Sequence, residues 1–141
     1  MEKELRRPVE HFLKESGMEV LHEVSINGRI ADVVGVSKDL IAIELKLTDW
    51  RRGLRQAMSY QLACDRSYLC LPFHEALRMT YKAHYFEKEG VGVLGCLLDS
   101  GEVRVIIRAR PSRRLLPFLA DFLRDSLLEK GCLRLGSDLK D

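Results

Sequence analysis

The segment Leu40–Leu47, with the sequence LIAIELKL, constrains the fold of this chain more than any other. In a β-strand, successive side chains point to opposite faces, so the four odd-numbered residues, all Ile or Leu, would share one face. Glu44 and Lys46 share the other face, behind Leu40 and Ala42. A strand that begins apolar on both faces and ends with two charges on one face is typical of the edge of a functional site.

The sequence around this strand predicts an α/β fold with a mixed central sheet. Asn27-Gly28 between two apolar runs indicates a tight hairpin turn, so the first three strands are expected to form an antiparallel meander. A strand–helix–strand unit then favours a parallel crossover to the fourth strand. The elements predicted up to Pro72 are a helix over 2–16, strands over 18–24, 29–36 and 40–47, a helix over 51–64 and a strand over 67–71.

Beyond Pro72 the pattern predicts further elements that flank or extend the core. We expect a helix over 75–88 that stops at Gly90, a hairpin of 91–98 with 102–108, and a last helix over 114–130 that carries Leu115, Leu119, Phe122, Leu127 and Leu128. We therefore interpret 1–141 as a single domain with a core over 1–72, a C-terminal elaboration over 73–131 and a loosely held tail over 132–141.

Composition sets the class of protein broadly. A chain of 141 residues with 46% hydrophobic residues can build one core, and its net charge of +2 means that any binding of polyanions depends on local clustering. No apolar run is long enough to cross a bilayer, and the first residues lack the apolar stretch of a signal peptide, so we expect a cytoplasmic protein. The four cysteines are far apart, which favours reduced core thiols over a zinc site.

A second acidic residue is expected beside Glu44 and Lys46. Asp32 lies between Ile30 and Val34 on one face of the preceding strand, where an apolar residue would pack better. Two carboxylates beside one ammonium suit a hard cation such as Mg²⁺. The alternative is a structural ion pair between Lys46 and one of the two acids.

The order of these residues resembles the PD-(D/E)XK nuclease superfamily, which has the restriction-endonuclease-like fold. Asp32 and Glu44-Leu45-Lys46 match its D and E-x-K positions, with Ala31 in place of the proline of the name. Gln56-Ala57-Met58-Ser59-Tyr60 matches the Q-x-x-x-Y motif of the RecB-like branch. Together with the α-β-β-β-α-β order, the resemblance covers residues 1–72.

The resemblance implies a nuclease that hydrolyses phosphodiester bonds of DNA with Mg²⁺ or Mn²⁺, in repair, recombination or defence; RNA stays open as a substrate. Asp32, Glu44 and the backbone carbonyl of Leu45 would hold the metal, and Lys46 would position the attacking water and offset charge in the transition state. Gln56 and Tyr60 would orient water or phosphate, although both could equally be interior packing. Nucleases of this type commonly act as homodimers, which we expect here.

Family members often add a glutamate from the first helix. Glu2 and Glu4 are the candidates, since Glu2-Lys3-Glu4-Leu5 is similar to the start of archaeal Holliday-junction resolvases. Both could instead be solvated surface residues.

Two arginine clusters are candidates for contact with nucleic acid. Arg51, Arg52 and Arg55 follow the catalytic strand directly, and no acidic residue stands between Val103 and Leu116, a stretch that holds Arg104, Arg108, Arg110, Arg113 and Arg114. Alternatively, the first cluster is only the solvent-exposed side of a helix, and the second is only the solvent-exposed face of a hairpin. The aromatic residues Tyr81, Tyr85 and Phe86 favour a core or dimer surface.

Two other functions compete with the nuclease. One is a nuclease-like fold used only as a nucleic-acid-binding or assembly module. The other is an unrelated α/β domain in which Asp32, Glu44 and Lys46 form an ion pair.

Overall fold

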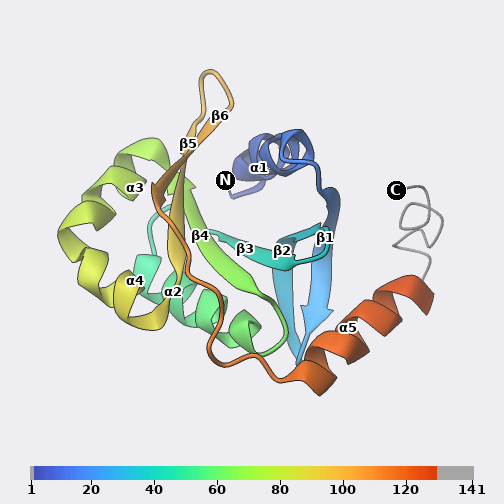
Figure 1. Cartoon of the computed structure of the whole chain (residues 1–141). Helices are drawn as coiled ribbons and strands as arrows, with labels where there is room; N and C mark the ends of the chain where they lie inside the picture. Colours follow the sequence, from blue (N-terminus) through green and yellow to red (C-terminus); the bar gives the residue numbers. More distant parts are fainter. Residues whose placement is uncertain (1, 130–141) are drawn as a thin grey trace.

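A computed structural model describes residues 2–129 of the chain. It contains a six-stranded sheet with helices on both faces (Figure 1). The elements follow in the order α1 (Lys3–Glu15), β1 (Glu19–Ile26), β2 (Arg29–Val36), β3 (Leu40–Leu45), α2 (Trp50–Ser59), the 3-10 turn η1 (Tyr60–Leu62), β4 (Arg66–Pro72), α3 (Phe73–Arg78), the 3-10 turn η2 (Met79–Lys82), α4 (Ala83–Glu89), β5 (Gly92–Leu97), β6 (Glu102–Ile107) and α5 (Pro117–Glu129).

The sheet confirms the predicted mixed topology. Its strands lie in sequence order, β1 to β6. The pairs β1–β2 and β2–β3 are antiparallel, β3–β4 and β4–β5 are parallel, and β5–β6 is antiparallel. The C-terminal hairpin therefore extends the same sheet, because β5 pairs directly with β4. No helix of the described residues is long and apolar enough to cross a membrane.

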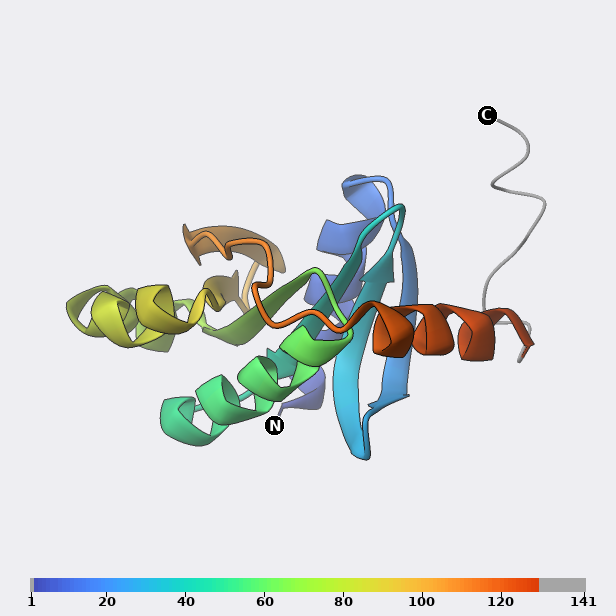
Figure 2. The same ribbon diagram turned by 60° about the horizontal axis from the view of Figure 1, so that its bottom comes forward.

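The two faces of the sheet are covered by different helices. On one face, Leu5, Val9 and Leu13 of α1 pack with Val33 and other residues of the central strands. The opposite face is covered by α2 and α4 over β4 and β5, and by α5 over β1 and β2. Figure 2 shows the C-terminal end of α2 near the start of α5, with the two helices extending in opposite directions. The result is a three-layer α/β/α arrangement.

In the first half of the chain, the structure agrees closely with the elements predicted from the sequence. The turn at Asn27-Gly28 has φ values of 48° and 83°, as a two-residue hairpin of type I′ requires. The helix α1 ends before Gly17, whose φ is 83°. Cys64, Cys70 and Cys96 are buried free thiols, as predicted, whereas Cys132 lies outside the described residues.

The single helix predicted over 75–88 is broken into α3, η2 and α4. Thr80 contributes to the break, since its hydroxyl donates to the backbone carbonyl of Leu77 at 2.8 Å and competes with regular helical bonding. The predicted stop at Gly90 is confirmed by its φ of 76°. Of the predicted aromatic stripe, Phe86 is fully buried but Tyr81 is 88% exposed.

The last helix begins at Pro117, three residues later than predicted. The preceding coil is held by bonds from Ser112 to Asp65 and from Leu116 to Leu62 of η1, and a proline is well suited to the first turn of a helix. As a result α5 buries Leu123 and Leu127, while Phe122 is 69% exposed. The tail predicted over 132–141 lies outside the described residues.

Candidate metal centre

The candidate site lies where β2 and β3 separate. The two strands pair from Val36↔Leu40 as far as Val33↔Ile43 and no further, although β2 stays paired with β1. Beyond that point the carboxylate of Asp32 replaces a backbone acceptor, since its Oδ2 accepts a hydrogen bond from the N–H of Leu45 at 2.8 Å. We call this point, where Asp32 and Glu44 lie on separating strands, the fork.

Glu44 occupies this fork as a nearly buried acid. Its side chain lies beside Asp32, and the residue is only 4% exposed. Burial raises the pKa of Glu44 to about 7, and the negative charge of Asp32 raises it as well. A hydrogen bond from Tyr60 and the positive charge of Lys46 lower that pKa but only in part. The predicted convergence of Asp32 with Glu44 is confirmed.

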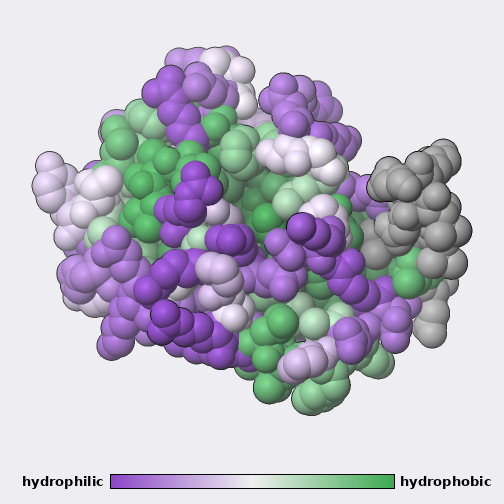
Figure 3. All heavy atoms as spheres, viewed as in Figure 1, coloured by the Kyte–Doolittle hydropathy of each residue, from purple (hydrophilic) through white to green (hydrophobic). Residues whose placement is uncertain are grey.

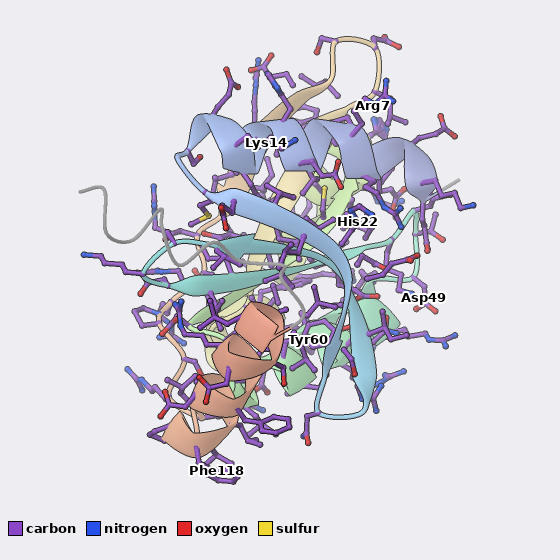
Figure 4. All side chains as sticks on the ribbon, turned by 90° about the vertical axis from the view of Figure 1, so that its right-hand side faces the viewer. Arg7, Lys14, His22, Asp49, Tyr60 and Phe118 are labelled. Carbon is purple, nitrogen blue, oxygen red and sulfur yellow. The ribbon has the colours of Figure 1, made fainter. Side chains whose placement is uncertain are left out.

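Tyr60 ties Glu44 to the separated part of β2. Its Oη lies 2.7 Å from Glu44 Oε1 and 2.8 Å from the backbone carbonyl oxygen of Ile30. A phenol has one hydrogen, so it cannot donate fully to two acceptors. The Tyr60 hydroxyl is thus shared between Glu44 Oε1 and the carbonyl oxygen of Ile30, on the side of the sheet that faces α5 (Figure 4).

Lys46 directly follows β3 and forms an ion pair with Glu44. The strand ends at Leu45, two residues earlier than predicted, although the N–H of Lys46 still donates to the carbonyl of Cys70 at 3.0 Å. Its Nζ lies 3.9 Å from Glu44 Oε2, and its side chain is 13% exposed. Lys46 is therefore an ion-pair partner of Glu44 that keeps access to solvent.

Gly53 lets α2 close against Lys46. A Cβ atom at position 53 would lie 2.9 Å from Lys46 Cγ and 2.5 Å from Leu69 Cδ1, and both distances are shorter than real contacts allow. Our sequence reasoning missed this residue. The signal was available, because a glycine inside an otherwise helical pattern often marks a close approach of two elements.

Gln56 contributes an unsatisfied acceptor on the same helix. The helix begins after Asp49, whose carboxylate accepts from the N–H of Arg52 at 3.3 Å. Spacings of three and four residues then place Gly53, Gln56 and Tyr60 on one side of α2. Within the described chain the Oε1 atom of Gln56 is buried and has no hydrogen-bond partner. Such an atom is expected to accept from a water or ligand.

The residues of the fork fit a hard divalent cation. Two adjacent carboxylates supply the oxygen ligands that Mg²⁺ prefers, and the unpartnered Gln56 oxygen indicates a place for bound water. The described residues contain no group of three or more His, Cys, Asp and Glu side chains that could hold a metal. Neither Glu2 nor Glu4, both exposed on or beside α1, is thus gathered with Asp32 and Glu44. The remaining ligand positions would go to water, substrate and backbone oxygens, Leu45 among them.

The arginines of the first predicted cluster are exposed on α2. Arg51 lies over the Trp50 ring at 4.7 Å, and Trp50 in turn packs against Tyr85 and Phe86 of α4. Arg52 and Arg55 are exposed.

The second predicted cluster divides into structural and free arginines. Arg114 donates to Gln61 Oε1 and pairs with Glu89, while Arg110 donates to the carbonyl of Glu87, so both hold the coil against α4. Both residues stay exposed, and their predicted contact with phosphate stays a prediction. Arg108 and Arg113 are exposed.

This coil lies at the end of the sheet opposite to Lys46. The N–H of Ser112 donates to the carbonyl of Asp65, directly before β4, at 2.7 Å. Because β3 and β4 are parallel, Asp65 lies near the start of β3 and Lys46 at its end.

Comparisons of the chain with models of known protein families, with curated proteins and with solved structures found no match. The interpretation of the site therefore rests on its geometry.

Proposed function

We propose that this protein is a Mg²⁺-dependent nuclease with a restriction-endonuclease-like fold, and that it hydrolyses phosphodiester bonds of DNA. One observation carries the proposal: Asp32 and Glu44, from separating strands, place two carboxylates side by side with Lys46 Nζ 3.9 Å from one of them. The α-β-β-β-α-β order, with a parallel fourth strand, supports the proposed fold.

The composition of the site is better suited to a ligand than to a structural ion pair. A simple ion pair needs one acid for one base, whereas here a second carboxylate raises the pKa of the first and makes the site less stable when both are ionised. Such an arrangement is costly unless a cation neutralises it. A bound Mg²⁺ or Mn²⁺ would polarise the phosphate and make a bound water more acidic.

The side chains have distinct tasks in this reaction. Asp32 is held by the N–H of Leu45 through one oxygen, and its other oxygen would be a metal ligand. Glu44 would bind the metal as a carboxylate, with the hydroxyl of Tyr60 donating to its Oε1. Lys46 would position the water and offset the charge that develops on phosphorus-bound oxygens. Gln56 would accept a hydrogen bond from the attacking water through its free Oε1.

The test is cleavage of labelled linear, branched and single-stranded DNA, and of RNA, with Mg²⁺, Mn²⁺ or EDTA. We expect metal-dependent cutting by the wild type and loss of at least about a hundredfold in Lys46→Ala, because charge-stabilising groups contribute on that order. Lys14→Ala, which removes an exposed lysine of α1, is the matched control. Equal behaviour of the wild type and Lys46→Ala on every substrate would overturn the proposal.

A second candidate is a nucleic-acid-binding module without catalysis. The exposed arginines of α2 favour it, because they could hold a phosphate backbone whether or not the fork binds metal. Binding that is unchanged by Glu44→Ala, together with no cleavage, would support this candidate. The homodimer and the cytoplasmic location stay predictions.

A further inference from the structure

Two segments of the chain carry positive charge without acids to neutralise it. No Asp or Glu occurs between Trp50 and Cys64, or between Val103 and Ala120. Many arginines elsewhere are paired, such as Arg6 with Glu23, Arg78 with Glu75 and Arg104 with Glu102. In the described chain, by contrast, no ion pair or side-chain hydrogen bond is formed by the exposed cations Arg52, Arg55, Lys88 and Arg113.

The fold places these four cations around one helix. The coil between β6 and α5 crosses the C-terminal end of α2 and η1, where the hydroxyl of Ser112 donates to the carbonyl of Gln61 at 2.7 Å and the N–H of Leu116 donates to that of Leu62 at 2.9 Å. Figures 1 and 2 show the coil and this end of α2 side by side. Strongly hydrophilic surface covers the region of α2 and the coil in Figure 3.

The far end of this surface is hollowed. A small cleft of about 80 Å³ lies between the end of α4 and the coil, and Gln61, Lys88, Glu89, Gly90, Arg110, Pro111, Arg113 and Arg114 line it. Glu89 is already paired with Arg114, and Arg110 is bonded to the backbone of α4. Lys88 and Arg113 therefore remain as the cations that a ligand entering the cleft would meet, and the cleft has room for a phosphate group.

We propose that Arg52, Arg55, Lys88 and Arg113 form a track that binds the phosphate backbone of a nucleic-acid strand along α2, from the fork to the cleft at the far end. A helix of ten residues is about 15 Å long, which spans a few successive phosphates of one strand. No internal ion pair of these four cations has to break on binding, although Lys88 stands between Glu87 and Glu89 in the sequence. The inference rests on the proposed function only for placing the scissile phosphate at the Lys46 end.

Because the track lies on one side of the fork, the bound strand extends mainly from the cleaved bond toward the cleft. Arg51 is left out of the track, since its guanidinium is stacked on Trp50. Arg108 is also left out, because it lines a separate hollow on the β6 side of α4 together with Glu87.

The experiment measures binding without cleavage. Fluorescence anisotropy of a labelled 20-nucleotide single strand and of the matching duplex is followed in EDTA from 50 to 300 mM KCl, for the full chain and for Arg52→Gln/Arg55→Gln/Arg113→Gln. The control Arg7→Gln/Arg78→Gln/Arg104→Gln removes the same charge from exposed positions outside the track. Circular dichroism checks that both variants fold.

We expect the track variant to bind at least about tenfold more weakly at 100 mM salt. The slope of log affinity against log salt concentration should be smaller in magnitude by about two to three. The control should keep most of its affinity. Equal losses in the two variants, or no binding by the wild type, would overturn the track.

Cleavage is measured in parallel with Mg²⁺. If binding depends on the track but no variant or wild type cuts, the proposed function fails and the track stands. If Lys46→Ala abolishes cutting while the track variant binds like the wild type, the track fails and the nuclease stands.

Discussion

Tyr60 Oη lies 2.7 Å from Glu44 Oε1 in the interior of the protein, and it also contacts the carbonyl of Ile30 from a strand that has separated from its neighbour. This contact joins η1, directly after α2, to β2 and β3 at one atom. The pKa of Glu44 therefore depends on how the helix and the two strands pack, because the hydrogen bond from Tyr60 lowers it.

Glu44 should make the metal-free protein less stable as pH rises. Its pKa in the folded protein is about 7, above its ordinary value of 4.5, so the folded state holds a proton that the unfolded state releases. The stabilisation is complete below pH 4.5 and is lost as pH rises through about 7, with a size of up to about 3 kcal/mol. Urea unfolding in EDTA at pH 5 and pH 8 measures it.

Glu44→Gln supplies the comparison, because its amide is neutral at every pH. We expect this variant to be more stable than the wild type at pH 8 and to have a flatter pH dependence. A wild type that gains stability relative to Glu44→Gln between pH 5 and pH 8 would show that Glu44 has no raised pKa.

Tyr60→Phe should weaken the fork. The substitution leaves Ile30 and Glu44 without their shared partner, and an unsatisfied buried group costs about 1 to 3 kcal/mol. Because the hydrogen bond from Tyr60 lowers the pKa of Glu44, its loss should also move the pH profile of Mn²⁺ binding upward. Urea unfolding and calorimetric titration measure the two effects. Tyr81→Phe changes an 88% exposed tyrosine and should alter neither.

Asp32→Asn should separate the two tasks of this side chain. The amide oxygen of Asn can still accept from the N–H of Leu45, so the variant should fold with nearly normal stability but bind Mn²⁺ at least about tenfold more weakly. Asp32→Ala should lose both properties and cost about 1 to 3 kcal/mol. Normal Mn²⁺ affinity in Asp32→Asn, measured by calorimetry, would remove Asp32 from the proposed ligands.

Gly53→Ala should destabilise the protein, although helix propensity alone would favour alanine at this position. Alanine in a helix is normally more stable than glycine by about 1 kcal/mol. Here the added methyl would press on Lys46 and Leu69, so we expect a loss of about 1 to 3 kcal/mol and slower cleavage. Urea unfolding decides the sign, and a stabilised variant with full activity would mean that the contact with Lys46 is unimportant.

The alternation of side chains in the sequence predicted the meander, the parallel fourth strand and the position of Glu44 and Lys46 at the end of β3. These features could be predicted because they depend on local patterns: a period of two residues, an Asn-Gly turn and a change to helical spacing. The boundaries were less certain, and the single helix over 75–88 was wrong because the 3-10 turn η2, which contains Thr80, divides it.

Other features were decided only by contacts between distant parts of the chain. The pattern of residues 29–36 does not show that β2 leaves β3 after Val33, nor that Asp32 then bonds Leu45. The sequence likewise does not distinguish Arg114, which pairs with Glu89, from the unpaired Arg113 beside it. The types and spacing of the reactive residues are thus set by the sequence. Their protonation, burial and partners depend on distances across the fold, because electrostatic and hydrogen-bond energies are set by which groups finally meet.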